Sequence, residues 1–117
     1  MSYIDGFLAP ILPHVTPEAY RDFAANAAVI FKEHGAIRVV ETWEDDVADG
    51  KTTDFRRAVN LGEGEKVVFS WIEWPDKAAR DTGWTKAMAD PRMQPGDTMP
   101  FDGPRMVYGG FRVLLDE

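Results

Sequence analysis

The sequence contains no cysteine and only two histidines in 117 residues. Without cysteine there is no disulfide framework, no thiolate metal ligand and no cysteine nucleophile. The two histidines, His14 and His34, do not form the pattern of a zinc site or a facial triad. No glycine-rich loop has the pattern that cradles a phosphate. We therefore expect no metal and no haem, flavin or other cofactor.

The sequence also lacks a long hydrophobic run. No apolar stretch reaches the roughly 18 residues that a membrane-spanning helix needs. Residues Met1–Asp5 have neither the basic start nor the apolar core of a signal peptide. Together with the missing cysteines, this predicts a cytoplasmic protein without a membrane partner.

Positive charge is scarce. Thirteen Lys and Arg stand against 20 Asp and Glu, which gives a net charge of −7. The densest basic run is the pair Arg56 and Arg57, and phosphate backbones are bound by larger clusters of cations. We therefore expect no nucleic-acid partner.

What remains is the composition of an ordinary globular protein, with 44% hydrophobic, 28% charged and 12% aromatic residues. A chain of this length is large enough for one hydrophobic core and too short for two. The sequence thus predicts a single domain that spans residues 1–117.

The first half of the chain predicts a strand, a helix and a second strand. Tyr3–Leu12 is rich in β-branched, aromatic and aliphatic residues. Thr16-Pro17-Glu18 is a typical helix start, and the apolar positions that follow recur at helical spacing up to Gly35. The second strand covers Ala36–Glu44, whereas residues 52–60 fit a short helical turn as well as an extra strand.

The second half repeats this order. Lys66–Trp74 has the clearest strand composition, and a helix follows from Asp76 to Ala89. The last strand covers Arg105–Leu115, where Gly109-Gly110 indicates a bulge or a close approach. The order β-α-β-β-α-β is ferredoxin-like: an α+β fold in which two helices cover one face of a four-stranded antiparallel sheet.

The other face of the sheet is then open, and alternation along each strand predicts which side chains lie there. We expect Ile4, Leu8, Val68 and Ile72 to face the helices. The residues expected on the open face are three acids, Asp5, Glu41 and Glu73, and five aromatic residues, Tyr3, Phe7, Trp43, Phe69 and Trp71.

So large an apolar face calls for a partner, and a second copy of the same sheet is the simplest one. Two facing sheets would form a barrel with an interior cavity. The sequence therefore predicts a homodimer.

The acids of the open face allow two interpretations. A carboxyl among aromatic rings has a raised pKa and can act as a general acid or base, so Glu41, Glu73 and Asp5 are candidate catalytic residues. The aromatic residues are candidate substrate-binding residues for a partly planar molecule. Alternatively, the acids form interface salt bridges with arginines of the chain, and both interpretations stay open. The candidate arginines are Arg38, Arg56, Arg105 and Arg112.

A proline-rich segment, Met99–Arg105, precedes the last strand. Its Met and Phe side chains need cover, which indicates an ordered loop. We expect this loop to close the mouth of the barrel or to contact the other subunit.

Five segments of the chain resemble the bacterial YbaA-like family of unknown function. They are Tyr3–Phe7, Phe31–Ala36, Val67–Pro75, Asp90–Met93 and Met99–Gly103. That family is similar to the dimeric α/β-barrel superfamily, which includes cofactor-free monooxygenases, isomerases, haem enzymes and ligand-binding regulators. The resemblance implies the fold and the dimer, but no catalytic residues.

The resemblance also sharpens the candidate functions. Several relatives carry a histidine near the barrel entrance, and the second predicted helix has none, which argues against haem. We expect a protein that binds a small, partly aromatic molecule in the barrel, with a cofactor-independent oxygenase or isomerase as candidate activities. The alternative is a non-catalytic structural or interaction protein with a salt-bridged barrel.

Overall fold

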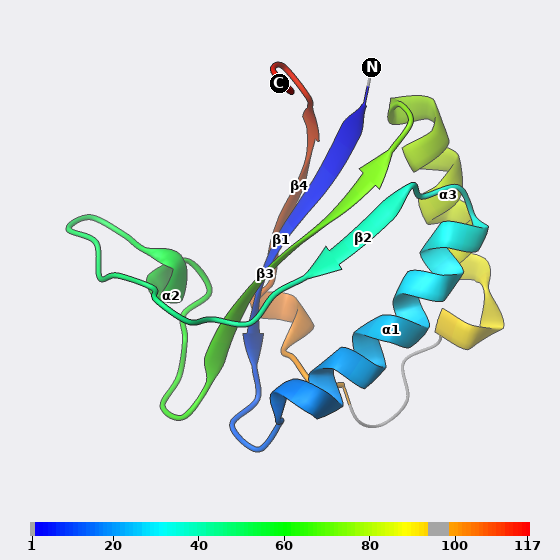
Figure 1. The fold of residues 1–117 in the computed structure, drawn as a ribbon. Coiled ribbons are helices and arrows are strands. Elements are labelled where there is room, and N and C mark those ends of the chain that lie inside the picture. Colours follow the sequence, from blue (N-terminus) through cyan, green and yellow to red (C-terminus); the bar gives the residue numbers. More distant parts are fainter. Residues whose placement is uncertain (1, 94–98) are drawn as a thin grey trace.

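The computed structural model describes residues 2–93 and 99–117. One antiparallel sheet of four strands forms its centre, and two long helices lie on the same face of that sheet (Figure 1). The strands are β1 (Tyr3–Ile11), β2 (Arg38–Glu41), β3 (Lys66–Trp74) and β4 (Val107–Arg112), and they lie in the order β2-β3-β1-β4. This topology confirms the predicted ferredoxin-like α+β fold.

Helix α1 (Pro17–Glu33) begins where the sequence predicts. The Thr16 hydroxyl accepts a hydrogen bond from the Ala19 amide, and Pro17 occupies the first turn. After the helix the chain turns at Gly35, whose φ of +112° favours glycine.

The second strand is much shorter than the predicted Ala36–Glu44, because side chains take over the bonding to β3 after Glu41. The Thr42 hydroxyl accepts a hydrogen bond from the Phe69 amide (3.3 Å) and also bonds the Phe69 carbonyl. The Glu44 carboxylate accepts one from the Val67 amide (2.8 Å). The backbone is thereby released and leaves the sheet as an arm, residues 42–65.

The arm contains the segment 52–60, for which the sequence left two alternatives. The structure forms the helical one, a short helix α2 (Phe55–Ala58). Asp54 caps it by accepting a hydrogen bond from the Arg57 amide (2.8 Å). Figure 1 shows the arm projecting from the sheet on the side away from the two long helices.

Helix α3 (Lys77–Ala89) packs closely on β3 because it contains a glycine. A Cβ atom at Gly83 would lie 2.3 Å from the Trp74 ring, so only glycine fits there without a shift. Trp74 is fully buried in a cluster that joins both long helices to the sheet, together with Tyr3, Ile30, Phe31, Ala36, Ile72 and Ala87. A second cluster lies under the start of α1 and contains Ala9, Ile11, Tyr20, Ala24 and Val68.

The last strand is also shorter than the predicted Arg105–Leu115, since Gly103–Arg105 forms a 3-10 turn instead. Its pairing with β1 runs unbroken through Gly109 and Gly110, so there is no bulge. The predicted close approach does occur. A Cβ atom at Gly110 would lie 2.2 Å from Nη2 of Arg80 and 2.4 Å from the Tyr3 hydroxyl.

The loop that precedes β4 packs against its own chain. Phe101 pairs with Ile11 in an isolated bridge and its ring meets that of Phe23 edge-on. Arg105 binds Asp102 (2.7 Å) and holds both oxygens of Glu65 (2.8 Å each). Contact between this loop and another subunit stays a prediction. Residues 94–98, which precede the loop and include Pro95, lie outside the described residues.

None of the helices within residues 2–93 and 99–117 is long and apolar enough to cross a membrane.

Candidate functional site

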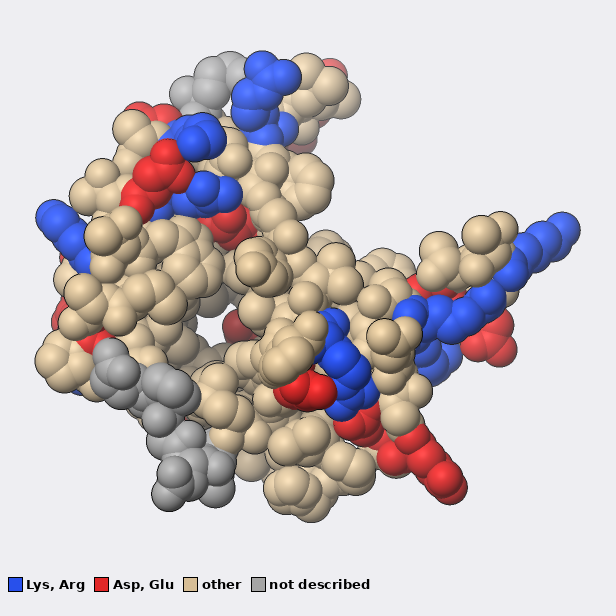
Figure 2. Space-filling model, turned by 180° about the vertical axis from the view of Figure 1, so that it is seen from behind, with Lys and Arg blue, Asp and Glu red and all other residues tan. Residues whose placement is uncertain are grey.

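A pocket lies between α1 and the edge strand β2, on the helix side of the sheet. Its volume is about 370 Å³. Figure 2 shows the molecule from behind, hollowed at its centre between the helical layer and the sheet. The pocket is lined by Pro17, Tyr20, Arg21, Ala24, Ala25, Ala28, Val39, Glu41, Thr42 and Trp43.

The walls of the pocket follow from the local sequence. Three alanines, Ala24, Ala25 and Ala28, turn small side chains of α1 towards it and leave room above the sheet. Val39 and Glu41 reach it from below because alternate residues of β2 point to the helix side. The tilted rings of Tyr20 and Trp43 lie 6.1 Å apart, centroid to centroid.

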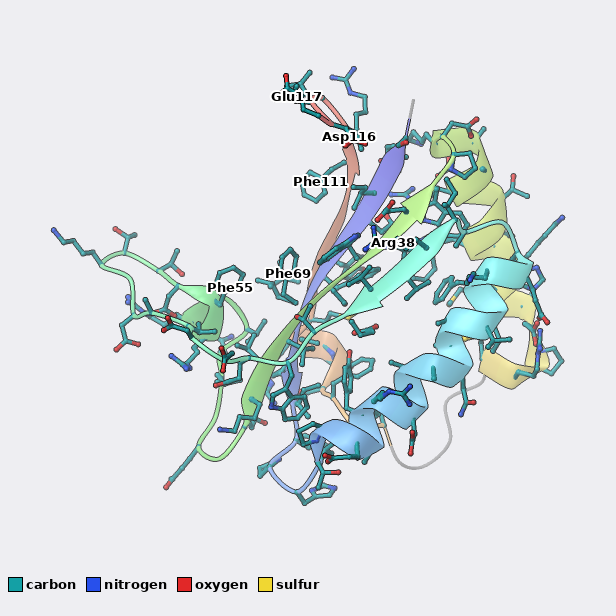
Figure 3. All side chains as sticks on the ribbon, viewed as in Figure 1. Arg38, Phe55, Phe69, Phe111, Asp116 and Glu117 are labelled. Carbon is teal, nitrogen blue, oxygen red and sulfur yellow. The ribbon has the colours of Figure 1, made fainter. Side chains whose placement is uncertain are left out.

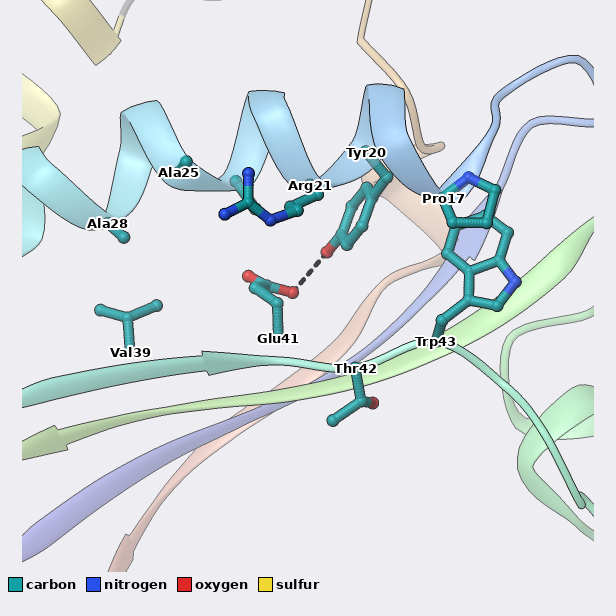
Figure 4. A pocket seen from close by; sticks show the side chains of 10 residues that line it. Pro17, Tyr20, Arg21, Ala25, Ala28, Val39, Glu41, Thr42 and Trp43 are labelled. Atoms are coloured by element: carbon teal, nitrogen blue, oxygen red, sulfur yellow. Dashed lines mark hydrogen bonds between the residues drawn. The ribbon is translucent and has the colours of Figure 1, made fainter.

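The polar centre of the pocket is a pair formed by Tyr20 and Glu41 (Figure 4). The Tyr20 hydroxyl donates a hydrogen bond of 2.6 Å to Oε1 of Glu41. In the described part of the chain, no ion pair joins Glu41 to a Lys or Arg. Figure 4 shows the Arg21 guanidinium above Glu41, and Arg21 itself pairs with Asp22 at 3.7 Å on the surface.

The pKa of Glu41 is raised above its ordinary value. Desolvation by the surrounding protein is the main cause, and hydrogen bonds from Tyr20 and Ser70 act in the opposite direction. Glu41 as a whole is nevertheless exposed at the sheet edge, so its desolvation is partial. Burial, the nearby Glu41 charge and the hydrogen bond also raise the pKa of Tyr20, which therefore stays a neutral donor. The arrangement is a carboxyl that can take up or release a proton beside an apolar cavity.

The structure corrects the face predicted for β1. Tyr3, Asp5 and Phe7 point towards the helices, and Ile4 and Leu8 lie on the open face. The prediction placed the aliphatic residues inside, but the larger Tyr3 and Phe7 rings fill the space under the helices. Asp5 can lie among them because the polar groups around it satisfy its carboxylate.

Asp5 is 4% exposed and accepts three hydrogen bonds. The indole nitrogens of Trp74 and Trp84 bond its Oδ2 at 2.9 and 2.7 Å. Nε of Arg80 bonds its Oδ1 at 3.0 Å, and the guanidinium also lies over the Tyr3 ring at 5.0 Å from the centroid. These contacts make a closed, fully paired cluster that joins α3 to the sheet.

The predicted face of β2 is also wrong for Glu41 and Trp43. Both point to the helix side, where Glu41 meets Tyr20 and Trp43 packs on the second core cluster. Arg38 and Val40 lie on the open face instead, because the register sets Val39 and Glu41 opposite Ile72 and Ser70 of β3, which face the helices.

For β3 the prediction holds: Phe69, Trp71 and Glu73 lie on the open face, and Val68 and Ile72 face the helices. Nη1 of Arg38 lies 3.4 Å from Oε2 of Glu73, and the Trp71 indole donates to the same carboxyl at 3.1 Å. Glu73 is thus paired with an arginine, as the structural interpretation expected.

The open face is largely apolar. Figure 3 shows Phe55, Phe69 and Phe111 on the side away from α1 and α3, with Arg38 at the β2 edge. Phe69 lies between Trp71 and Phe55, with ring centroids 5.6 and 6.1 Å away. The surface is completed by Ile4, Leu8, Val40 and Val107.

The structure therefore separates the eight predicted site residues into three places. Glu41 and Trp43 share the pocket, Tyr3, Asp5 and Phe7 lie under α3, and Phe69, Trp71 and Glu73 lie on the open face. The sequence analysis missed Tyr20 and Arg21 as site residues. The run Ala24-Ala25 with Ala28 beside an aromatic residue on the same helix was the available signal.

Across residues 2–93 and 99–117, no group of three or more His, Asp or Glu side chains is arranged to hold a metal ion.

Comparison with known proteins identifies the family. A family described as "Protein of unknown function (DUF1428)" matches residues 2–103. The chain is 56% identical to the uncharacterized protein YbaA of Escherichia coli K12 over 118 residues, which cover 100% of both chains, and equally to that of Shigella flexneri.

Among solved structures, the chain is similar to SnoaB, a cofactor-independent oxygenase from Streptomyces nogalater. The TM-score is 0.52 at 16% identity, over 97% of this chain and 95% of that one. At this identity the likeness concerns the fold alone, and it agrees with the ferredoxin-like α+β class. The resemblance seen in the sequence is thus confirmed, and the chain belongs to the DUF1428 family together with YbaA.

Proposed function

We propose that this protein binds a small, partly aromatic molecule in the pocket between α1 and β2, and that Glu41 transfers a proton there. The observation that carries the proposal is the Glu41 carboxyl at the pocket wall, which accepts a hydrogen bond from Tyr20 and forms no ion pair among the described residues. A carboxyl held in this way is suited to general acid–base work.

The lining of the pocket supports this class of ligand. Its volume of about 370 Å³ lies at the small end of ligand sites, and its lining combines small and aliphatic side chains with the rings of Tyr20 and Trp43. A flat ring can lie against Trp43, and the Arg21 guanidinium can bind an anionic substituent at the mouth. An aromatic acid or a related phenolic compound combines these features.

The chemistry we propose is proton abstraction by Glu41 from an acidic C–H or O–H of the ligand. Tyr20 then stabilises the carboxyl through its hydrogen bond and keeps it oriented. A cofactor-independent oxygenase and an isomerase both need such a step, and SnoaB shares the fold of this chain. No metal or organic cofactor takes part in the proton transfer itself.

We assign this role to Glu41 alone among the three acids predicted from the sequence. Asp5 and Glu73 each have an arginine partner, Arg80 and Arg38. These two ion pairs are what the alternative predicts, namely a non-catalytic structural or interaction protein. If the pocket binds nothing, that alternative is the function that remains.

We further propose that the protein is a homodimer, joined through the open sheet face. The face carries exposed apolar side chains, among them Phe69, Val107 and Phe111, and a second copy of the same sheet would cover them. A cytoplasmic location and the absence of a nucleic-acid partner stay predictions, supported by the lack of cysteine and the net charge of −7.

The decisive experiment is a binding screen with aromatic acids, phenols and quinones, followed by calorimetry on the parent, Glu41→Gln and Ala28→Leu. We expect Glu41→Gln to lose at least about tenfold in affinity or activity, and Ala28→Leu to fill the pocket and abolish binding. Glu73→Gln is the matched control, because Glu73 is also a strand glutamate but faces away from the pocket.

Proton transfer is tested separately from binding. A bound ligand with an acidic C–H is incubated in D2O, and its deuterium content is followed by mass spectrometry. The parent should accelerate exchange and Glu41→Gln should not. Failure of the whole library to bind, or equal exchange with both proteins, would rule out the proposed function.

A further inference from the structure

The open sheet face is organised in rows that cross all four strands. The register pairs Arg38 with Glu73, Glu73 with Ile4, and Ile4 with Phe111. Arg38 and Phe111 therefore lie at the same height, at opposite edges of the face. The side chain of Arg38 is 62% exposed, so its guanidinium keeps donors free for a second carboxylate beside Glu73.

The chain continues past β4 in a segment that leaves the sheet, residues 113–117. The Val113 amide still bonds the Ser2 carbonyl at 3.2 Å. Leu114 and Leu115, which follow, are 95% and 74% exposed. Figure 3 shows Asp116 and Glu117 just beyond Phe111, at the end of the sheet where the Arg38 row lies. The segment thus combines uncovered leucines with two acids.

We propose that in the homodimer, which is part of the function proposed above, residues 113–117 of each protomer dock beside Arg38 of its partner. The partner's Asp116 and Glu117 then face the Arg38 guanidinium. The partner's Leu114 and Leu115 cover the apolar part of the open face beside Arg38, where Val40 and Trp71 lie.

Two facing sheets can be related by a two-fold axis that runs parallel to the strands, and this axis leads to the proposed arrangement. A two-fold axis that runs parallel to the strands, midway between the sheets, brings β4 of one protomer opposite β2 of the other. Such an axis leaves every residue at its own height along the strands. Because Arg38 and Phe111 share a row, the segment that follows Phe111 arrives next to the partner's Arg38.

Charge favours the same arrangement over its alternatives. Arg38 is the one cation that the strands, as far as they are described, turn to the open face. Two copies with a net charge of −7 each repel one another unless their acids meet cations at the interface. The contact between residues 113–117 and Arg38 occurs twice in a symmetric dimer, so its favourable free energy contributes twice.

A cross-link tests the geometry directly, because the chain has no cysteine of its own. The double variant Arg38→Cys/Asp116→Cys, oxidised and run on a non-reducing gel, should give a covalent dimer. Within one chain the two positions lie at opposite sheet edges, about three strand spacings of ~4.8 Å apart, which is too far for a disulfide. The matched control is Asp22→Cys/Asp116→Cys, with a cysteine at an exposed position of α1 outside the pocket lining, and it should stay monomeric on the gel.

Charge reversal tests the energetics by sedimentation equilibrium. We expect Arg38→Glu, and separately Asp116→Arg/Glu117→Arg, to raise the dimer dissociation constant by about tenfold. The variant that combines Arg38→Glu with Asp116→Arg/Glu117→Arg should recover most of the lost dimer affinity. Changes that act only locally would not compensate one another in this way.

The outcomes separate this inference from the proposed dimer. A parent that is monomeric at micromolar concentration overturns both. A dimeric parent with no cross-link between positions 38 and 116, and with an unchanged dissociation constant in Asp116→Arg/Glu117→Arg, overturns the docking of the segment and leaves the dimer in place.

Discussion

The hydroxyl of Tyr20 and the carboxyl of Glu41 are joined by a 2.6 Å hydrogen bond that spans the space between α1 and β2. The helix supplies the donor and the edge strand the acceptor. Desolvation raises the pKa of Glu41 in the folded protein. Ionising this carboxyl therefore costs more free energy in the folded state than in the unfolded chain.

Glu41→Gln should therefore make the protein relatively more stable as the pH rises. Below the ordinary glutamate value of 4.5, both folded and unfolded chains hold the proton and the parent loses nothing. As the pH rises from 4.5 through the raised pKa, the parent loses stability that the glutamine variant keeps. Urea unfolding at pH 4 and pH 7.5 measures the difference.

Glu18→Gln, on the exposed first turn of α1, is the control for that series. A difference between the Glu41 variant and the parent that stays constant with pH, or shrinks above pH 4.5, contradicts the prediction.

Asp5→Asn should be strongly destabilising, by about 3 to 5 kcal/mol, because it leaves Arg80 without its buried partner. The amide keeps one acceptor oxygen, so its NH2 must face either the two indoles or Arg80, all of which are donors themselves. Chemical denaturation provides the measurement. Asp81→Asn, an exposed acid that also binds Arg80, should cost less than about 1 kcal/mol. Similar losses in the two variants would show that the Asp5 cluster is not the link between α3 and the sheet.

Gly83→Ala should destabilise by about 1 to 3 kcal/mol, although alanine is the better helix former. The added Cβ would lie 2.3 Å from the Trp74 ring and 2.8 Å from the His34 carbonyl, so the helix must move. Gly103→Ala serves as the control, since no atom lies within 4 Å of a Cβ there. Thermal unfolding that shows Gly83→Ala more stable than the parent would exclude this account of the glycine.

Glu65→Gln should weaken the protein at neutral pH by about 1 to 2 kcal/mol and have no effect in strong acid. The hydrogen bonds from Arg105 are the main cause that lowers the pKa of Glu65 to about 2. Its contribution is thus complete above pH 4.5 and is lost as the pH falls towards 2. Acid titrations of the parent and the variant, followed by circular dichroism, should converge at the lowest pH. A gap that persists at pH 2 would contradict the prediction.

The order of elements was predictable from the sequence because local signals agree with the fold. Thr16-Pro17 is a helix start that needs no tertiary contact, and the composition of Lys66–Trp74 is enough to predict a strand. The early end of β2 was not predictable, since it depends on Thr42 and Glu44 bonding the backbone of a strand distant in sequence.

The site was harder to predict than the fold. Alternation groups the residues of a strand correctly but does not say which group faces the helices. For β1 the choice depends on Arg80, Trp74 and Trp84, which reach Asp5 from other elements. The partner of Glu41 lies on a helix 21 residues earlier, and no local pattern reveals that pair.

The four tryptophans of this chain lie in three different surroundings, and each can act as an intrinsic optical probe. Trp43 lines the pocket, so quenching of its emission reports ligand, whereas Trp71 lies on the open face and its emission shifts when a second sheet covers it. Trp74 and Trp84, both bonded to Asp5, report the integrity of the core. Replacing Trp43 or Trp71 by phenylalanine would therefore let a single fluorescence titration distinguish ligand binding from subunit association without any added dye.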